Sequence, residues 1–167
     1  MDTSKPWENE PNQRAWIDEE TGLRCMILRT PLTGTLCGYV RLPRGHKFTR
    51  RGNYSSRRSR RYSQYGDGLM RLSVHGGITF HGRPRRLTGG NVRGTWIGFD
   101  CAHYMDYMPN LDFILPPFIG RLSGNGDMAK HSKAINGTYR TFDYVTKEVE
   151  HLARQVRASD KHKARKK

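Results

Sequence analysis

The chain has 167 residues, with 30 lysines and arginines against 15 acidic residues and a net charge of +15. This length predicts one domain with a core of its own, and three cysteines without a CxxC pair exclude a disulfide framework and a zinc ribbon. The acidic N-terminus does not resemble a signal peptide, and no apolar run is long enough to span a membrane. We therefore expect a protein of the cytoplasm without a membrane partner.

The N-terminal part of the chain predicts a polar arm followed by two strands. Residues 1–21 show little apolar periodicity and are expected to form an arm, which Trp7 and Trp16 pin to the domain. Gly22–Leu28 resembles a strand, and Leu36–Leu42 alternates as a half-buried strand does. The short connection between these two segments favours an antiparallel pair.

Loops and shorter strands alternate in the middle of the chain. Residues 43–68 have no hydrophobic period, so they are expected to form a long, arginine-rich loop. Leu69–His75 and Ile78–Phe80 are predicted to be strand segments, and Gly76-Gly77 between them indicates a bulge, a bend or a close approach to the backbone. Trp96–Asp100 has a strong strand pattern.

The C-terminal segment predicts an amphipathic helix. Its apolar residues recur at spacings of three and four: Phe142, Val145, Val149, Leu152 and Val156. Thr141 suits the N-cap of this helix, and the basic tail of residues 157–167 is expected to be mobile. The predicted fold is α+β, with one domain over residues 22–156. It combines a small antiparallel sheet, long basic loops and this helix packed on the sheet.

Two short segments place polar residues at or beyond the end of an apolar strand. The first begins near His75, and the second carries Asp100, His103 and Asp106 at its end. If the two strands are neighbours, His75 faces Asp100 across the sheet. The other three polar residues are spaced three apart, so a helical turn would bring them to one side.

Three functional interpretations fit these residues. A metal site of mixed nitrogen and oxygen ligands would suit Zn, Mn or Fe, and a divalent metal could activate water against a phosphodiester. Its candidate ligands are His75, Asp100, His103 and Asp106. Metal-free catalysis would use a histidine base oriented by a carboxylate. Its candidates are His75, Asp100 and His103.

A phosphate cradle without chemistry is the third interpretation, because backbone N–H groups at glycines bind anions. It would be lined by His75, Gly76, Gly77, Thr79, Asp100 and His103. In a purely structural alternative, Asp100 and His103 cap a turn and hold two strands together. No zincin, Walker or Rossmann spacing decides among these interpretations.

Arginines dominate the charge of two loops. The first lies within residues 43–68 and interleaves arginine with tyrosine, and the second lies between residues 83 and 93. Arginine pairs with phosphate in bidentate fashion and tyrosine stacks on unpaired bases, so this mixture is typical of RNA-binding segments. A solvated loop without a ligand is the alternative. The candidate nucleic-acid contacts are Arg50, Arg51, Arg57, Arg58, Arg60, Arg61, Arg85 and Arg86.

Four segments carry a resemblance to a known family: Leu36–Val40, His75–Phe80, Trp96–His103 and Tyr139–Val145. Across residues 22–156 the chain resembles a family of small uncharacterised proteins of bacteriophages and prophages, and its HGG and GFDCAH segments are the most specific parts. The resemblance implies a phage accessory protein in the host cell cytoplasm and assigns no catalytic residue. The arginine-rich loop is more basic than the family pattern, so nucleic-acid binding would belong to this member.

Three functional hypotheses remain open, and with them the question whether the protein is an enzyme. The leading one is a binding protein for a phosphate-rich ligand, either nucleic acid or a nucleotide such as a signal of bacterial immunity. The second is a metal-dependent hydrolase of nucleic acid or nucleotide. The third is an inhibitor that docks on a host protein through its uneven charge, with Trp7 and Trp16 as anchors.

Overall fold

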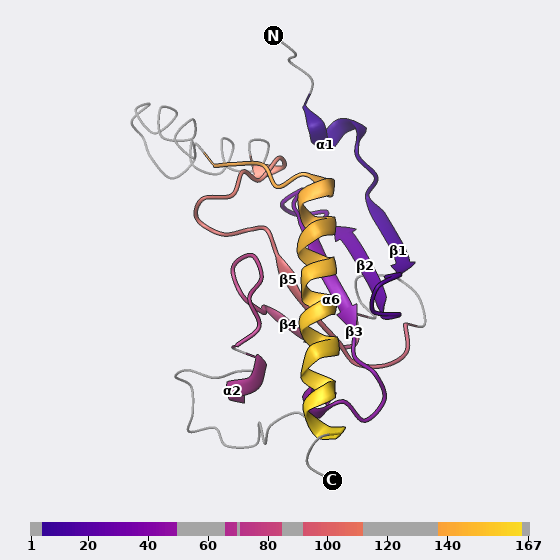
Figure 1. The fold of residues 1–167 in the computed structure, drawn as a ribbon. Helices are drawn as coiled ribbons and strands as arrows, with labels where there is room; N and C mark the ends of the chain where they lie inside the picture. Colours follow the sequence, from indigo (N-terminus) through magenta and orange to yellow (C-terminus); the bar gives the residue numbers. More distant parts are fainter. Residues whose placement is uncertain (1–4, 50–65, 70, 85–91, 112–136, 165–167) are drawn as a thin grey trace, which may run out of the picture.

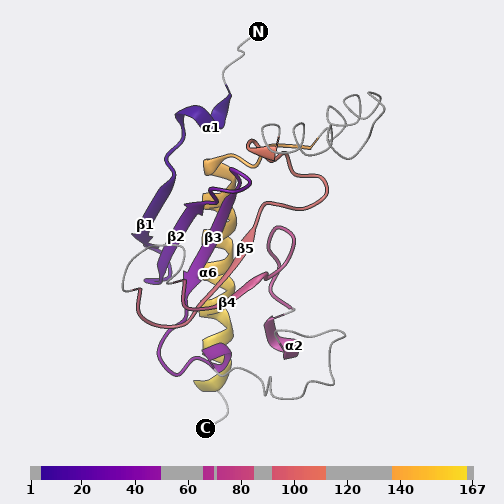
Figure 2. The ribbon, with the colours of Figure 1, turned by 180° about the vertical axis from the view of Figure 1, so that it is seen from behind.

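The described part of the chain folds as an antiparallel sheet with a long helix packed on it. In the computed structural model the described residues are 5–49, 66–69, 71–84, 92–111 and 137–164. Their elements in chain order are α1 (Pro6–Asn9), β1 (Gln13–Ile17), β2 (Arg24–Arg29), β3 (Leu36–Arg41), a 3-10 turn (Lys47–Thr49), α2 (Gly66–Leu69), β4 (Phe80–Gly82), β5 (Trp96–Asp100) and α6 (Phe142–Ala164). The strands form one sheet in the order β1-β2-β3-β5-β4. Figure 1 shows α6 along one face of this sheet, and Figure 2 shows the strands from behind. The expected α+β fold is confirmed.

The alternation of side chains divides the sheet into two apolar faces. On the face that α6 covers, Ile27 of β2, Val40 of β3 and Ile97 of β5 are fully buried. Val40 and Ile97 are paired across β3 and β5, so their side chains lie next to each other under the helix. Tyr39 and Trp96 point to the opposite face and belong to a second, smaller cluster.

Helix α6 begins with two satisfied backbone donors and carries a buried apolar ridge. Thr141 Oγ1 accepts a hydrogen bond from the N–H of Tyr144 at 3.2 Å, which confirms the expected cap. Glu10 Oε1 accepts one from the N–H of Phe142 at 2.8 Å. The residues of the ridge are all 0% exposed: Val145, Val149, Leu152, Ala153 and Val156.

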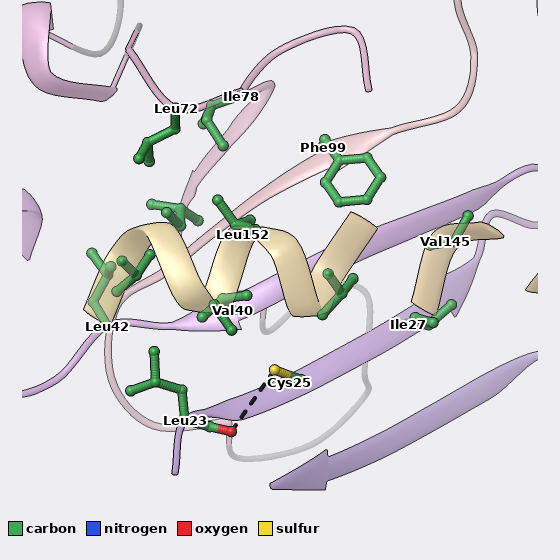
Figure 3. Packing of buried hydrophobic residues seen from close by; sticks show 14 of the residues in the cluster. Leu23, Cys25, Ile27, Val40, Leu42, Leu72, Ile78, Phe99, Val145 and Leu152 are labelled. Atoms are coloured by element: carbon green, nitrogen blue, oxygen red, sulfur yellow. Dashed lines mark hydrogen bonds between the residues drawn. The ribbon is translucent and has the colours of Figure 1, made fainter. Parts of the chain in front are cut away.

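The helix approaches β3 closely at Gly38. A Cβ atom on this glycine would lie 2.5 Å from Cγ2 of Val149 and 2.6 Å from the ring of Phe99. A larger residue would therefore push α6 away from the sheet. Leu72 and Ile78, from the segment before β4, join the same cluster beside the helix (Figure 3).

The expected N-terminal arm contains a strand. Within residues 1–21, Gln13–Ile17 form β1, which pairs with β2 at the edge of the sheet. Trp16 packs against the core, while the other residues of β1 are exposed. An edge strand with one inward apolar residue has no alternating pattern to reveal it.

Two further expectations need correction. The described residues of Leu69–His75 form no strand: α2 ends at Leu69, residues 71–79 are irregular, and β4 begins only at Phe80. The basic tail is not free of structure from residue 157 onward, because α6 continues to Ala164. The apolar ridge ends at Val156, but a helix can extend into solvent beyond its last buried turn.

The candidate nucleic-acid contacts from Arg50 to Arg61, with Arg85 and Arg86, lie outside the described residues, and their roles stay predictions. The described parts of the long basic loop are Pro43–Thr49 and α2. None of the helices that the structure describes has the length and apolar character needed to cross a membrane.

Candidate functional site

The carboxylate of Asp106 is the centre of a polar cluster in the loop after β5. Asp106 is 1% exposed. Its Oδ2 atom accepts hydrogen bonds from His75 Nε2 at 2.7 Å and from the backbone N–H of His103 at 3.0 Å. Its Oδ1 atom accepts one from Arg140 Nε at 2.8 Å. A buried carboxylate needs hydrogen-bond donors to offset its desolvation, so Asp106 holds His75, His103 and Arg140 around itself.

Three side chains of α6 hold the segment that carries His75. Gln155 accepts from the N–H of Ser73 and donates to its carbonyl, both at 2.8 Å. Glu148 accepts from the N–H of His75 at 2.8 Å, and the Tyr144 hydroxyl lies 3.1 Å from His75 Nδ1. Spacings of four and seven residues place these side chains on one ridge of the helix. The helix therefore positions His75, which lies in no strand.

The ring of His103 occupies the space where a side chain of residue 76 would lie. A Cβ atom on Gly76 would overlap the Cε1 and Nε2 atoms of His103, and Gly76 has a φ of +63°. Glycine has no Cβ to overlap the His103 ring and adopts a positive φ without strain. The Nδ1 atom of His103 is buried, lies 3.3 Å from Asp106 Oδ2 and has no hydrogen-bond partner. The cluster thus contains an unsatisfied polar atom.

Arg140 reaches Asp106 from the segment before α6. The N–H of Thr138 donates to the carbonyl of Met105 at 2.9 Å, which ties this segment to the loop of Asp106. The guanidinium also lies over the ring of Tyr144, with 5.1 Å from Cζ to the ring centroid. Its Nε atom binds Asp106, its Nη atoms bind no described residue, and the side chain is 25% exposed. Within the described part of the chain, Arg140 therefore has donors left for an anion.

The N-terminal segment supports the same region from another side. The Tyr139 hydroxyl donates to Glu10 Oε2 at 2.6 Å, and Arg29 Nη2 lies 3.2 Å from the same oxygen. The Trp7 ring centroid is 5.0 Å from those of Tyr107 and Tyr139. Trp7 thus pins the N-terminal residues as expected. Because Glu10 also caps α6, a carboxylate already occupies the helix N-terminus.

Asp106 stays ionised in spite of its burial. Burial acts to raise the pKa of the Asp106 carboxyl, but hydrogen bonds from Arg140, His75 and a backbone N–H outweigh it, so this pKa lies below its ordinary value of 3.8. The hydrogen bond to Asp106 raises the pKa of Arg140 in turn. Burial, together with the charge of Glu148, raises the pKa of the Tyr144 hydroxyl, which therefore stays protonated at neutral pH.

Three groups of the cluster could hold a metal ion: His75, His103 and Asp106. One ligand atom from each lies within 4.8 Å of the others. Two imidazoles and a carboxylate suit Zn, Mn or Fe and leave coordination positions for water or substrate. Tyr144 and Arg140 would then be the outer partners that orient His75 and Asp106. Three of the four expected metal ligands, His75, His103 and Asp106, therefore lie close enough together to share a metal ion.

Asp100, the fourth expected ligand, has another role. Its Oδ1 atom accepts from the N–H of Ala102 at 3.1 Å, and its partner across the sheet is Cys37. His75 does not face Asp100, because His75 is outside the sheet and binds Asp106. Asp100 thus caps the turn after β5, as the structural interpretation expected.

The expected phosphate cradle is brought together only in part. His75, Gly76 and His103 are neighbours, and Gly77 follows in the same turn with a φ of +84°. Thr79 is exposed, and its N–H donates to the carbonyl of Gly98 at 2.9 Å, so its backbone extends the sheet beside β5.

Sequence reasoning missed four supporting residues: Arg140, Tyr144, Glu148 and Gln155. The last three are polar, spaced four and seven apart and next to the apolar ridge of a predicted helix, which is a signal for a helix that binds a polar segment. No comparable signal indicates Arg140.

No protein-family model, curated protein or solved structure matches this chain, so no residue role is transferred from another protein.

Proposed function

We propose that the protein is a hydrolase that uses a divalent metal ion to cleave a phosphoester bond in nucleic acid or a nucleotide. The observation that carries this proposal is the buried Nδ1 atom of His103, which has no hydrogen-bond partner beside the carboxylate of Asp106. A buried polar atom without a hydrogen bond is unfavourable, and the carboxylate oxygen 3.3 Å away compensates for this only when the ring is protonated. A cation between His103, Asp106 and His75 would satisfy it.

Each candidate ligand has a partner that orients it. With a cation at Nε2 of His75, the proton of the ring lies on Nδ1 and donates to the Tyr144 hydroxyl oxygen, 3.1 Å away. Arg140 binds Oδ1 of Asp106, which leaves Oδ2 directed toward the histidines. The ring of His103 is held against Gly76. Such outer contacts are typical of metal sites.

The phosphoester part of the proposal rests on charge. A bound divalent metal supplies a Lewis acid and lowers the pKa of water. The Nη atoms of Arg140, which bind none of the residues that the structure describes, can bind a phosphate oxygen beside it. The net charge of +15 attracts polyanions to the molecule, and Asp106 does not oppose them because it is buried and paired with Arg140.

Metal analysis of the purified chain tests the proposal. We expect about one equivalent of Zn, Mn or Fe, and hydrolysis of a generic phosphodiester such as bis(4-nitrophenyl) phosphate, both lost in His103→Ala. His151→Ala is the matched control, because His151 is an exposed histidine of α6 outside the cluster, and this variant should keep both properties. A protein that neither contains nor takes up these metals is not a metal-dependent hydrolase.

Binding of a phosphate-bearing ligand without chemistry is the second candidate. His75 Nε2 lies 2.7 Å from Asp106 Oδ2, which is the length of a charge-assisted hydrogen bond and favours a proton between the two atoms. Arg140 would then bind the phosphate without a metal. Nucleotide affinity that persists in chelator-treated protein and in His103→Ala would favour this candidate.

The wider expectations stay predictions. They are the phage origin, action in the host cytoplasm, binding of an immune nucleotide signal, and docking on a host protein. The contribution of the arginine-rich loop is also a prediction, since its candidate residues lie outside the described ranges.

A further inference from the structure

An exposed aromatic side chain lies inside the loop of the candidate site. Tyr104 is 90% exposed and Met105 is 60% exposed, and both lie between His103 and Asp106. Among the described residues, the other large apolar side chains that are exposed are Ile17 and Leu32, which are in β1 and in the turn after β2. Tyr104 is thus the most exposed of the four, and the one that is aromatic.

The hydrogen bonds that build the site also fix the backbone of Tyr104. The N–H of Asp106 donates to the carbonyl of His103 at 2.9 Å and closes a four-residue turn. Asp106 Oδ2 accepts from the N–H of His103 at 3.0 Å, and the carbonyl of Met105 accepts from Thr138 at 2.9 Å. The ring of Tyr104 therefore faces solvent from a held backbone, which lowers the entropy lost when a ligand binds to it.

We infer that Tyr104 is a stacking platform for an unpaired nucleobase whose neighbouring phosphate binds at Arg140 and the cluster of His75, His103 and Asp106. This inference rests on the proposed function and names the substrate class of the same site. Tyrosine stacks on any base, because every base has a π-face. Bases inside a duplex are already stacked, so the ligand is a single strand or a free nucleotide.

The net charge of the chain, +15, favours an anionic ligand. Tyr104 directly follows His103 and lies two residues before Asp106, which pairs with Arg140, so a base on its ring would be held by the same loop that carries two residues of the candidate site. Asp106 is 1% exposed and paired with Arg140, so it does not repel that phosphate. An aromatic ring beside a cationic group is the combination by which proteins bind single strands.

Binding of a labelled oligothymidylate of about eight nucleotides tests the inference. Phosphorothioate linkages resist hydrolysis, so affinity is measured without turnover. We expect Tyr104→Ala to weaken binding roughly 5- to 100-fold, as the loss of one stacked base does. Tyr104→Trp should retain the affinity. Leu32→Ala removes a 69% exposed side chain from another turn and should change nothing.

An abasic oligomer of the same length and linkages separates stacking from phosphate binding. It should bind the unmodified chain and Tyr104→Ala equally. The inference is overturned if the unmodified chain and Tyr104→Ala bind the oligothymidylate with equal affinity. It is also overturned if Tyr104→Ala loses as much affinity for the abasic oligomer as for the oligothymidylate. Competition by thymidine monophosphate that depends on Tyr104 identifies a free nucleotide as the source, and binding of the oligomer alone identifies a strand.

The metal content of the same samples separates this inference from the proposed function. Tyr104→Ala should retain the metal, because its side chain is not a ligand. If no sample binds metal but the stacking effect persists, the hydrolase is rejected and the platform stands. If metal and hydrolysis are present but Tyr104→Ala binds the oligothymidylate normally, the platform is rejected and the hydrolase stands.

Discussion

Helix α6 presents two neighbouring ridges that differ in how they bind the rest of the molecule. The first packs into the sheet through apolar side chains that are 0% exposed: Val145, Val149, Leu152, Ala153 and Val156. The second holds the segment before β4 through hydrogen bonds of Tyr144, Glu148 and Gln155. Apolar burial is non-directional and scales with area, whereas these hydrogen bonds depend on distance and angle. One helix therefore supports both the stability of the fold and the geometry of the site, and the two should respond to different mutations.

The largest effect on stability should come from the apolar ridge. Leu152→Ala removes a fully buried side chain between α6 and the sheet, so we expect the free energy of unfolding to fall by about 2–5 kcal/mol. Chemical denaturation measures it. At low temperature, where the variant stays folded, metal uptake at His75, His103 and Asp106 should be unchanged.

The control for this comparison is an apolar residue outside the core. Leu32→Ala should change the free energy of unfolding by less than about 0.5 kcal/mol, because Leu32 is 69% exposed. If Leu152→Ala abolished metal uptake in folded protein, the two ridges would not be separable.

A smaller effect on stability, but a large one on the site, should follow from Gly76→Ala. The positive φ of Gly76 costs a non-glycine residue about 1–3 kcal/mol. The new Cβ would also displace the His103 ring, so we expect metal affinity to fall about 10- to 100-fold, the size of effect seen when ligand support is lost. Calorimetric metal titration of the folded variant measures it.

Gly77→Ala is the matched control. Gly77 has a φ of +84°, so alanine meets a similar backbone strain, but apart from its chain neighbours no described residue has an atom within 4 Å of a Cβ there. This variant should lose stability and keep its metal affinity. Equal metal affinities in the two variants would mean that the position of His103 does not matter for the site.

The two ridges also differ in how far sequence reasoning could reach. The apolar ridge and strands β2, β3 and β5 were predicted, because the apolar residues of a helix recur every 3.6 positions and those of a strand every second position within one short segment. The strand expected at Leu69–His75 was wrong, since Leu72 and Val74 pack on the core from an irregular segment. Alternation over so few residues does not distinguish a strand from an irregular segment that buries some of its side chains.

The sequence identified three of the clustered residues by their type, but it did not predict which residues contact one another. His75, His103 and Asp106 were candidates because their chemistry suits metals and phosphates. Their actual contacts join residues that are far apart in the chain: His75 with Asp106 31 positions away, and with Tyr144 69 positions away. No local period encodes such pairs, so the sequence favours Asp100 as the carboxylate that faces His75, whereas in the structure Asp106 is the carboxylate bonded to His75.

The smallest expected effect is a pH dependence that isolates Asp106. Arg140, His75 and the backbone of His103 face this carboxylate and hold its folded-state pKa below its ordinary value of 3.8. The folded protein therefore binds this proton less readily than the unfolded chain. The stabilisation is present above pH 3.8 and is lost as the pH falls through the lower folded value.

Asp106→Asn removes this titration and retains the shape of the side chain. In chelator-treated protein, its free energy of unfolding should therefore fall less steeply than that of the unmodified chain as the pH drops from about 5 to about 3. Denaturation curves at several pH values measure the difference, and the other carboxylates titrate equally in both proteins. Asp143→Asn is the control, because Asp143 is exposed and pairs with Lys147 at the surface, where an ion pair contributes little. Parallel curves for Asp106→Asn and the unmodified chain would mean that the ion pair of Asp106 with Arg140 contributes no net stability.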